Sequence, residues 1–155
     1  MVERTFYVET SVWGMIPKGQ PREMRRASLQ FLRQVPQPSL CMSEIVMQEI
    51  DLCSESDRSQ IMEVLSRSAP TRLDVTQECH DLARYYVESG ILSPRKPADA
   101  VHVAISTFHE VTVLVSWNHR HLANVRKAEL YRGANLIRGY PNTPLILTPL
   151  EVLHA

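Results

Sequence analysis

The stretch from Val111 to Trp117 constrains the fold of this 155-residue chain more than any other segment. It reads Val-Thr-Val-Leu-Val-Ser-Trp, which is β-branched and almost continuously apolar. Such a run is typical of a strand that is covered on both faces, as strands are in a parallel sheet with helices on either side. The segment therefore predicts an α/β fold, with Asn118 directly after the strand.

The rest of the chain alternates between short β-prone runs and segments with helical spacing of apolar residues. Further strands are predicted at 6–8, 40–42, 73–75 and 145–147. Helices are predicted at 24–35, at 44–53, between Ser54 and Pro70, at 79–90, at 97–108, at about 123–133 and as a terminal turn from Thr148. This alternation indicates a central parallel sheet flanked by helices, in a single domain over residues 1–155.

Charge and cysteine content limit the class of protein. Lysine plus arginine equals aspartate plus glutamate, 17 of each, so nucleic-acid binding would have to use a local patch. Candidate basic residues for such a patch are Arg22, Arg25, Arg26, Arg95, Lys96, Arg120, Arg126 and Lys127. The three cysteines, Cys41, Cys53 and Cys79, include no CxxC pair and favour reduced thiols. Without an apolar signal region or a run of about 20 apolar residues, we expect a soluble, cytoplasmic protein.

Polar residues follow the predicted strands at the point where ligands bind in open α/β sheets. Glu9 comes directly after the first strand and Asn118 after the 111–117 strand, while Asp99 opens a helix whose start should lie at the same edge. Each also has a local explanation. Turn and cap chemistry would explain Glu9 and Asn118, and the helix dipole would explain Asp99.

Glu49 is a candidate for a different reason. On a helix from Glu44 to Cys53 that the side chain of Ser43 is predicted to cap, it shares a face with apolar residues, where an unpaired carboxylate is costly. It therefore needs a cation, hydrogen bonds or a water-filled cleft, unless it simply reaches solvent or an arginine.

Taken together, five short blocks resemble the PIN domain, and within it the VapC-like toxins. The blocks are Tyr7–Trp13, Ser43–Ile50, Pro97–Ala104, Leu114–Leu122 and Thr148–Glu151. Their order is far more specific than any one of them, and they span almost the whole chain. The resemblance implies a PIN-like three-layer sandwich, with a central parallel sheet flanked by helices.

The resemblance also implies a function and a site. It implies a metal-dependent endoribonuclease that hydrolyses phosphodiester bonds of single-stranded RNA, as the toxin of a type II toxin-antitoxin pair. Its partners would be a small antitoxin protein and a second copy of the chain. By position, the catalytic and metal-binding residues would be Glu9, Glu49, Asp99 and Asn118. They would bind Mg²⁺ or Mn²⁺, which hard oxygen ligands suit.

Two departures from the family pattern leave an alternative open. The family usually has aspartate where this chain has Glu9 and Asn118, so only three carboxylates remain and a second metal ion is in doubt. The alternative is a weak or inactive PIN fold that binds RNA or protein. A phosphoryl-transfer or receiver domain is disfavoured, because the chain has no GxxxxGK[ST] loop and no DxDxT motif.

Several neighbours of these blocks have weaker signals. His102 lies one turn after Asp99 and is better explained by packing or hydrogen bonding than by metal binding. His119 and His121 flank Arg120 and are phosphate-contact candidates, although a solvated loop is the default interpretation. Ser11 and Ser116 are at best contacts that support the site. Core packing explains Trp13 better than a partner contact does.

Overall fold

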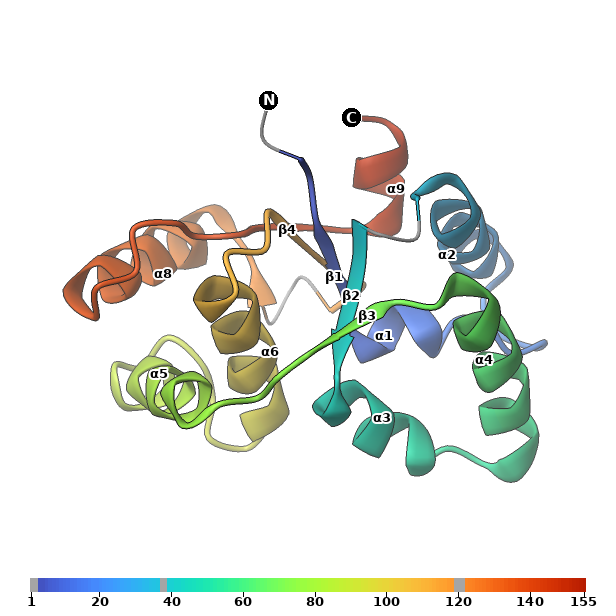
Figure 1. The fold of residues 1–155 in the computed structure, drawn as a ribbon, viewed down its shortest axis with the longest axis horizontal. Coiled ribbons are helices and arrows are strands. Elements are labelled where there is room, and N and C mark those ends of the chain that lie inside the picture. Colours follow the sequence, from blue (N-terminus) through green and yellow to red (C-terminus); the bar gives the residue numbers. More distant parts are fainter. Residues whose placement is uncertain (1–2, 37–38, 119–121) are drawn as a thin grey trace.

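A parallel sheet of five strands forms the centre of the computed structural model, which describes residues 3–36, 39–118 and 122–155 (Figure 1). The strand order is β3-β2-β1-β4-β5, and every neighbouring pair is parallel. The strands are β1 (Phe6–Val8), β2 (Leu40–Ser43), β3 (Thr71–Leu73), β4 (Val113–Val115) and β5 (Leu145–Leu147). The predicted parallel sheet is therefore confirmed.

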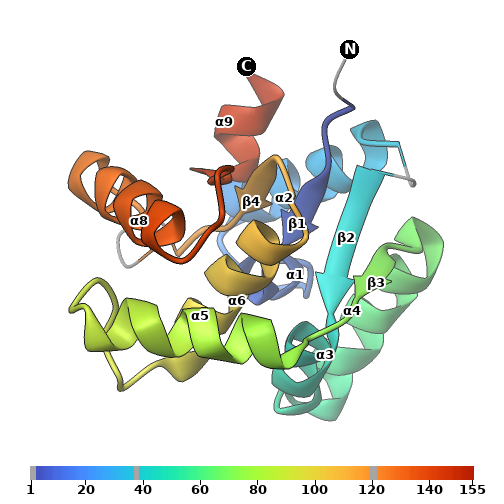
Figure 2. The same ribbon diagram turned by 60° about the vertical axis from the view of Figure 1, so that its left-hand side comes forward.

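Helices cover both faces of the sheet, which makes three layers. Figures 1 and 2 show α5, α6 and α8 on one side and α1, α2 and α4 on the other. The helices are α1 (Thr10–Trp13), α2 (Arg22–Gln34), α3 (Glu44–Asp51), α4 (Glu55–Ser68), α5 (Gln77–Glu88), α6 (Pro97–Phe108), α8 (Val125–Ile137) and α9 (Pro149–Leu153). None of these helices has both the length and the apolar character needed to span a bilayer.

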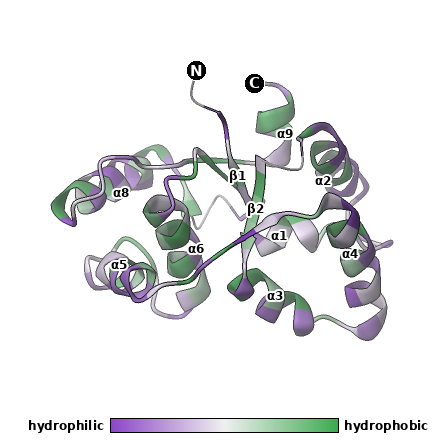
Figure 3. Cartoon of the chain, in the orientation of Figure 1, coloured by the Kyte–Doolittle hydropathy of each residue, from purple (hydrophilic) through white to green (hydrophobic). Residues whose placement is uncertain are grey.

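The core lies where β1 and β4 pack against α6. Figure 3 shows hydrophobic residues along α6, and Val103, Ala104 and Ile105 on this helix are fully buried. All three residues of β4 are buried as well, as the apolar run predicts for a strand covered on both faces. Pro97 stands at the start of α6, where its missing N–H costs nothing.

Several predicted boundaries are wrong. The 111–117 segment forms a strand only at 113–115, and the strand predicted at 73–75 lies at 71–73. The helix predicted at 123–133 runs from Val125 to Ile137, beginning after Asn124, whose side chain accepts the N–H of Lys127. Helix α1 was not predicted, because four residues are too short to carry a periodic signal. His119, Arg120 and His121 lie outside the described residues.

Candidate functional site

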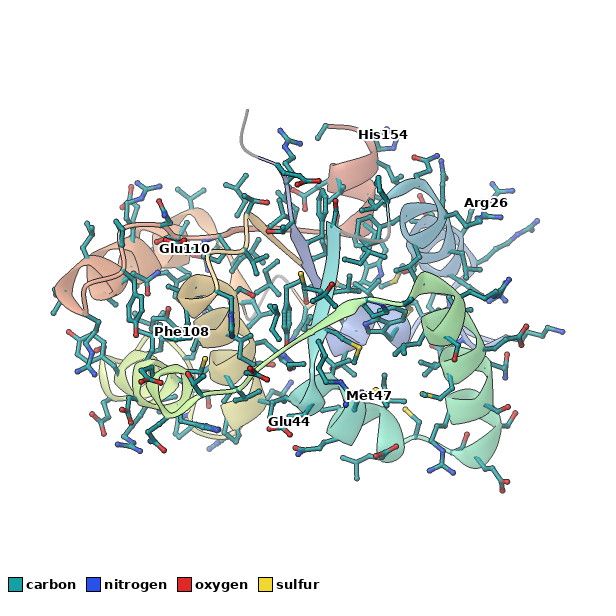
Figure 4. All side chains as sticks on the ribbon, in the orientation of Figure 1. Arg26, Glu44, Met47, Phe108, Glu110 and His154 are labelled. Carbon is teal, nitrogen blue, oxygen red and sulfur yellow. The ribbon has the colours of Figure 1, made fainter. Side chains whose placement is uncertain are left out.

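The four predicted site residues lie around one cleft at the carboxyl edge of the sheet. The cleft has a volume of about 680 Å³ and is lined by Glu9, Thr10, Ser11, Gly14, Glu49, Lys96, Pro97, Ala98, Asp99, Trp117 and Asn118. Strands β1 and β4 are neighbours with Val8 opposite Val115, so the residues that follow them emerge side by side. Helix α3 follows β2 at the same edge, where Figure 4 labels Glu44 at the start of the helix. The predicted gathering of these side chains is confirmed.

Glu9 is 5% exposed and its carboxylate is held by two serines. Ser11 donates its backbone N–H to Oε2 at 2.6 Å and its hydroxyl to Oε1 at 2.9 Å. Ser116 donates its hydroxyl to Oε1 at 2.6 Å. Glu9 is therefore the N-cap of α1, as a local explanation predicts, and also a wall of the cleft. The two serines position the carboxylate, in the supporting role expected for them.

Glu49 lies across the cleft and is tied through one oxygen. Its Oε1 accepts the hydroxyl of Thr10 at 2.7 Å and lies 2.6 Å from Nε2 of His102. Burial pushes the pKa of Glu49 up, but the hydrogen bond and charge of His102 and the bond from Thr10 outweigh burial and leave the pKa below its usual value. Glu49 is therefore an ionised carboxylate at neutral pH, and the side chain is still 34% exposed toward the cleft.

A buried chain of hydrogen bonds stands behind Glu49. His102 is 1% exposed, and its Nδ1 lies 2.7 Å from the hydroxyl of Tyr7, which lies 2.7 Å from Oγ of Ser43. An ionised carboxylate only accepts, so Nε2 of His102 donates to Glu49. When the imidazole is neutral, Nδ1 accepts from Tyr7, which accepts from Ser43; when it is protonated, Nδ1 donates to Tyr7, which donates to Ser43, so every member is paired in either state. Burial raises the pKa of Tyr7 and keeps its hydroxyl protonated.

These hydrogen bonds explain the positions of His102 and Ser43. His102 is hydrogen-bonded in the core, as the sequence predicts. Ser43 occupies the N-cap position of α3, but the prediction that its side chain caps the helix is wrong, because the structure has no such cap bond and Oγ is bound to Tyr7 instead. The contribution of Tyr7 was missed. The available signal was a tyrosine inside an otherwise apolar strand, since a buried phenol needs a polar partner.

Replacing His102 by leucine should lower both stability and metal affinity. The substitution removes one of the two hydrogen-bond partners of the Tyr7 hydroxyl and one of the two partners of Glu49, which costs roughly 1–3 kcal/mol. Loss of a group that orients a ligating carboxylate typically weakens metal binding about 10- to 100-fold. Urea denaturation and Mn²⁺ titration measure the two effects. Ser106→Ala on the same helix is the matched control, because the Ser106 hydroxyl donates to the nearby carbonyl of His102. Equal losses of stability and metal affinity in the two variants would exclude a specific role for the hydrogen bonds from Ser43 to Glu49.

Asp99 and Asn118 complete the cleft. Asp99 stands in the first turn of α6, and Nδ2 of Asn118 lies 3.5 Å from both of its carboxylate oxygens. Burial raises the pKa of Asp99, and the negative charge of Glu9 raises it further, against the opposing charges of His102 and Lys96. The aspartate thus carries its charge at a cost.

The donors around the cleft suit a hard divalent cation in their chemistry, since three carboxylates and an amide present oxygen atoms. They are not gathered tightly: within residues 3–36, 39–118 and 122–155, no three side chains of His, Cys, Asp or Glu form a group that could hold a metal ion. Both oxygens of Glu9 and Oε1 of Glu49 already accept from serine, threonine and histidine. The site therefore fits a cation in the type of its donor atoms and in their common location around one cleft.

Comparison with known proteins supports the fold. No protein-family model matches the sequence, and no curated protein matches it. Among solved structures, the chain is similar to a chain of the crystal structure of VapBC2 from Rickettsia felis bound to a DNA fragment from their promoter. The TM-score is 0.57 at 14% sequence identity, over 93% of this chain and 98% of that chain. An identity this low shows the fold alone. The predicted three-layer, PIN-like fold is therefore confirmed for this chain.

Proposed function

We propose that this chain is a single PIN domain that hydrolyses phosphodiester bonds of single-stranded RNA with the help of Mg²⁺ or Mn²⁺. The observation that carries the proposal is the meeting of Glu9, Glu49, Asp99 and Asn118 around one cleft at the carboxyl edge of a parallel sheet. These residues come from four separate blocks of the sequence. The ordered blocks and the coarse likeness to a VapBC chain support the same family.

In this proposal, Glu9, Glu49, Asp99 and Asn118 would hold the cation. The bound cation would supply charge neutralisation for the scissile phosphate and activation of a water molecule. The chain itself supplies the positioning. Ser11 and Ser116 hold the carboxylate of Glu9, and Thr10 and His102 hold that of Glu49. Because Asp99 carries its charge at a cost without metal, binding of a cation would relieve that cost.

The biological setting is also part of the proposal. The chain would be the toxin of a type II pair, with a small antitoxin as its partner. The similarity to a chain from a VapBC2 complex supports this setting. A homodimer would bury exposed apolar side chains at the contact between its two subunits. These are Val125, Leu130, Leu136 and Ile137 on α8 and Leu145 on β5.

A cleavage assay tests the proposed activity. The purified chain is incubated with an end-labelled single-stranded RNA in Mn²⁺ and, in parallel, in EDTA. We expect fragments only with the divalent ion, and the same RNA annealed to its complement should stay intact. A preparation of Asp99→Asn made in the same way controls for contaminating nucleases. Cleavage in EDTA, or no cleavage of any RNA with any divalent ion, would contradict the proposal.

Asn118 supports a second candidate, a PIN fold that binds RNA without cutting it. An amide at this position removes one negative charge from the cleft. Asn118→Asp distinguishes the two candidates. In an enzyme, a fourth carboxylate should tighten Mn²⁺ binding by roughly tenfold and lower the metal-free melting temperature, since it would lie beside Asp99. Unchanged Mn²⁺ affinity and RNA binding that persists in EDTA would favour the binding module.

A further inference from the structure

Trp117 lines the candidate cleft, and its indole ring is hydrogen-bonded to helix α2. It follows β4, lines the cleft beside Asn118 and is partly exposed. Its indole Nε1 donates to Oγ of Ser28 on α2 at 2.8 Å, and its backbone N–H donates to Oγ of Ser11 at 2.8 Å. Ser28 is fully buried and donates in turn to the carbonyl of Met24. The Nε1 bond therefore holds the ring, and the bond to Ser11 holds the backbone that carries it.

The direction of the indole N–H decides what the ring offers to the cleft. Its one polar side-chain atom is already paired with Ser28 on α2, so the ring has only hydrocarbon to present to the cleft that Trp117 lines. An apolar plane beside Asp99 and Asn118 contributes nothing to holding a cation. Trp13 differs, because it is fully buried and donates to the carbonyl of Val8 in the core.

We propose that Trp117 is a stacking platform for one base of the RNA strand, next to the phosphate that enters the acidic cleft. The proposal rests on the proposed function and deepens it. Every base has an aromatic face, so a fixed tryptophan holds a base without reading its identity. Lys96, on the same cleft, supplies a positive charge for a phosphate of the bound strand.

A stacking platform also accounts for a preference for single strands. The faces of bases in a duplex are covered by their neighbours, whereas bases of a single strand are free to stack on a side chain. The ring does not turn away to admit a duplex while its Nε1 bond to Ser28 holds. In this proposal, the selection of single strands therefore depends on Trp117.

Tryptophan fluorescence gives a direct test, because the chain has only two tryptophans and one of them is buried. The wild-type chain is titrated with a single-stranded heptamer RNA that has phosphorothioate linkages, in Mg²⁺ and in EDTA. We expect quenching that saturates with bound RNA and disappears in Trp117→Phe, where Trp13 alone still emits. Binding by the wild type without quenching would overturn the proposal.

Two variants separate stacking from packing. Trp117→Phe and Trp117→Leu both lose the bond to Ser28, but only phenylalanine keeps an aromatic face. We expect the leucine variant to bind the heptamer about 5- to 140-fold more weakly than the phenylalanine variant, since this is the usual range for one stacked base. Melting temperatures of the two variants identify any loss that is due to unfolding. Equal affinities of two folded variants would contradict stacking.

A set of heptamers, each with one abasic position, locates the base. Affinity for the wild type should fall at one position and stay unchanged at the others, and Trp117→Leu should not respond at that position. A response at no position would contradict the proposal. Failure of the proposed function has a different signature: quenching and the abasic response would persist while no divalent ion supports cleavage.

Discussion

Asp99→Asn is expected to reduce Mn²⁺-dependent RNA cleavage by about a thousandfold, equivalent to roughly 4 kcal/mol of transition-state stabilisation. Asparagine keeps the shape of the side chain but removes the negative charge that would face the cation. The fold should not suffer, because Asp99 is partly exposed and has a raised pKa from burial and from Glu9. Cleavage rates under single-turnover conditions measure the loss.

The same substitution should slightly raise the melting temperature in EDTA. A raised pKa means that the charged form of Asp99 destabilises the folded chain, so removing the charge gains at most a few degrees, as the partial exposure limits the effect. The gain should shrink as pH falls through the raised pKa, because Asp99 of the wild type then becomes protonated. Asp57→Asn is a matched control, since Asp57 also stands in the first turn of a helix but does not line the cleft. Full cleavage by Asp99→Asn would remove the basis of the proposed site.

Trp13→Ala is expected to cost about 3–5 kcal/mol of unfolding free energy, the largest stability effect of any prediction here. Trp13 is 0% exposed, and its Nε1 donates to the carbonyl of Val8 at 3.1 Å. Alanine leaves a cavity behind α1 and an unpaired carbonyl at the end of β1. The melting temperature should fall by roughly 6–20 °C.

Leu52→Ala is the control for Trp13→Ala, because Leu52 is a large apolar side chain that is 87% exposed. The unfolding free energy of the Leu52→Ala variant should differ from that of the wild type by less than about 0.5 kcal/mol. Urea denaturation of both variants gives the comparison. A small loss in Trp13→Ala would mean that α1 packs loosely, and the position of Glu9 at its N-cap would lose its support.

The sequence predicts the sheet well because apolar continuity is a strong signal over a whole strand. The run at 111–117 identifies a strand covered on both faces, and β4 at its centre is fully buried. The ends of helices and strands are harder to predict, since they depend on single capping bonds such as that of Asn124. Helix α1 could not be predicted from periodicity, because it makes only about one turn.

The meeting of Glu9, Asp99 and Asn118 could be predicted because the carboxyl ends of parallel strands lie at one edge, whereas Glu49 was added to them by the resemblance to the PIN domain. The hydrogen bonds that hold their oxygens could not be predicted from the sequence. Glu9 is bonded by Ser116, which is 107 positions away in the sequence, and His102 reaches Glu49 across 53 positions. Such bonds depend on side-chain directions that no spacing rule supplies. Among the described residues, the carboxylates are also less tightly gathered than a metal site inferred from sequence alone would suggest.

A Mn²⁺ titration of the melting temperature, on the wild type and on Asp99→Asn, tests the proposed metal site most directly. An ion that binds only the folded chain stabilises it by about 2.7 kcal/mol at 100 times its dissociation constant, which amounts to roughly 5–10 °C here. We predict that Mn²⁺ raises the melting temperature of the wild type by about this amount and leaves Asp99→Asn nearly unchanged. Equal responses of the two proteins, or none in either, would contradict a metal site at this cleft.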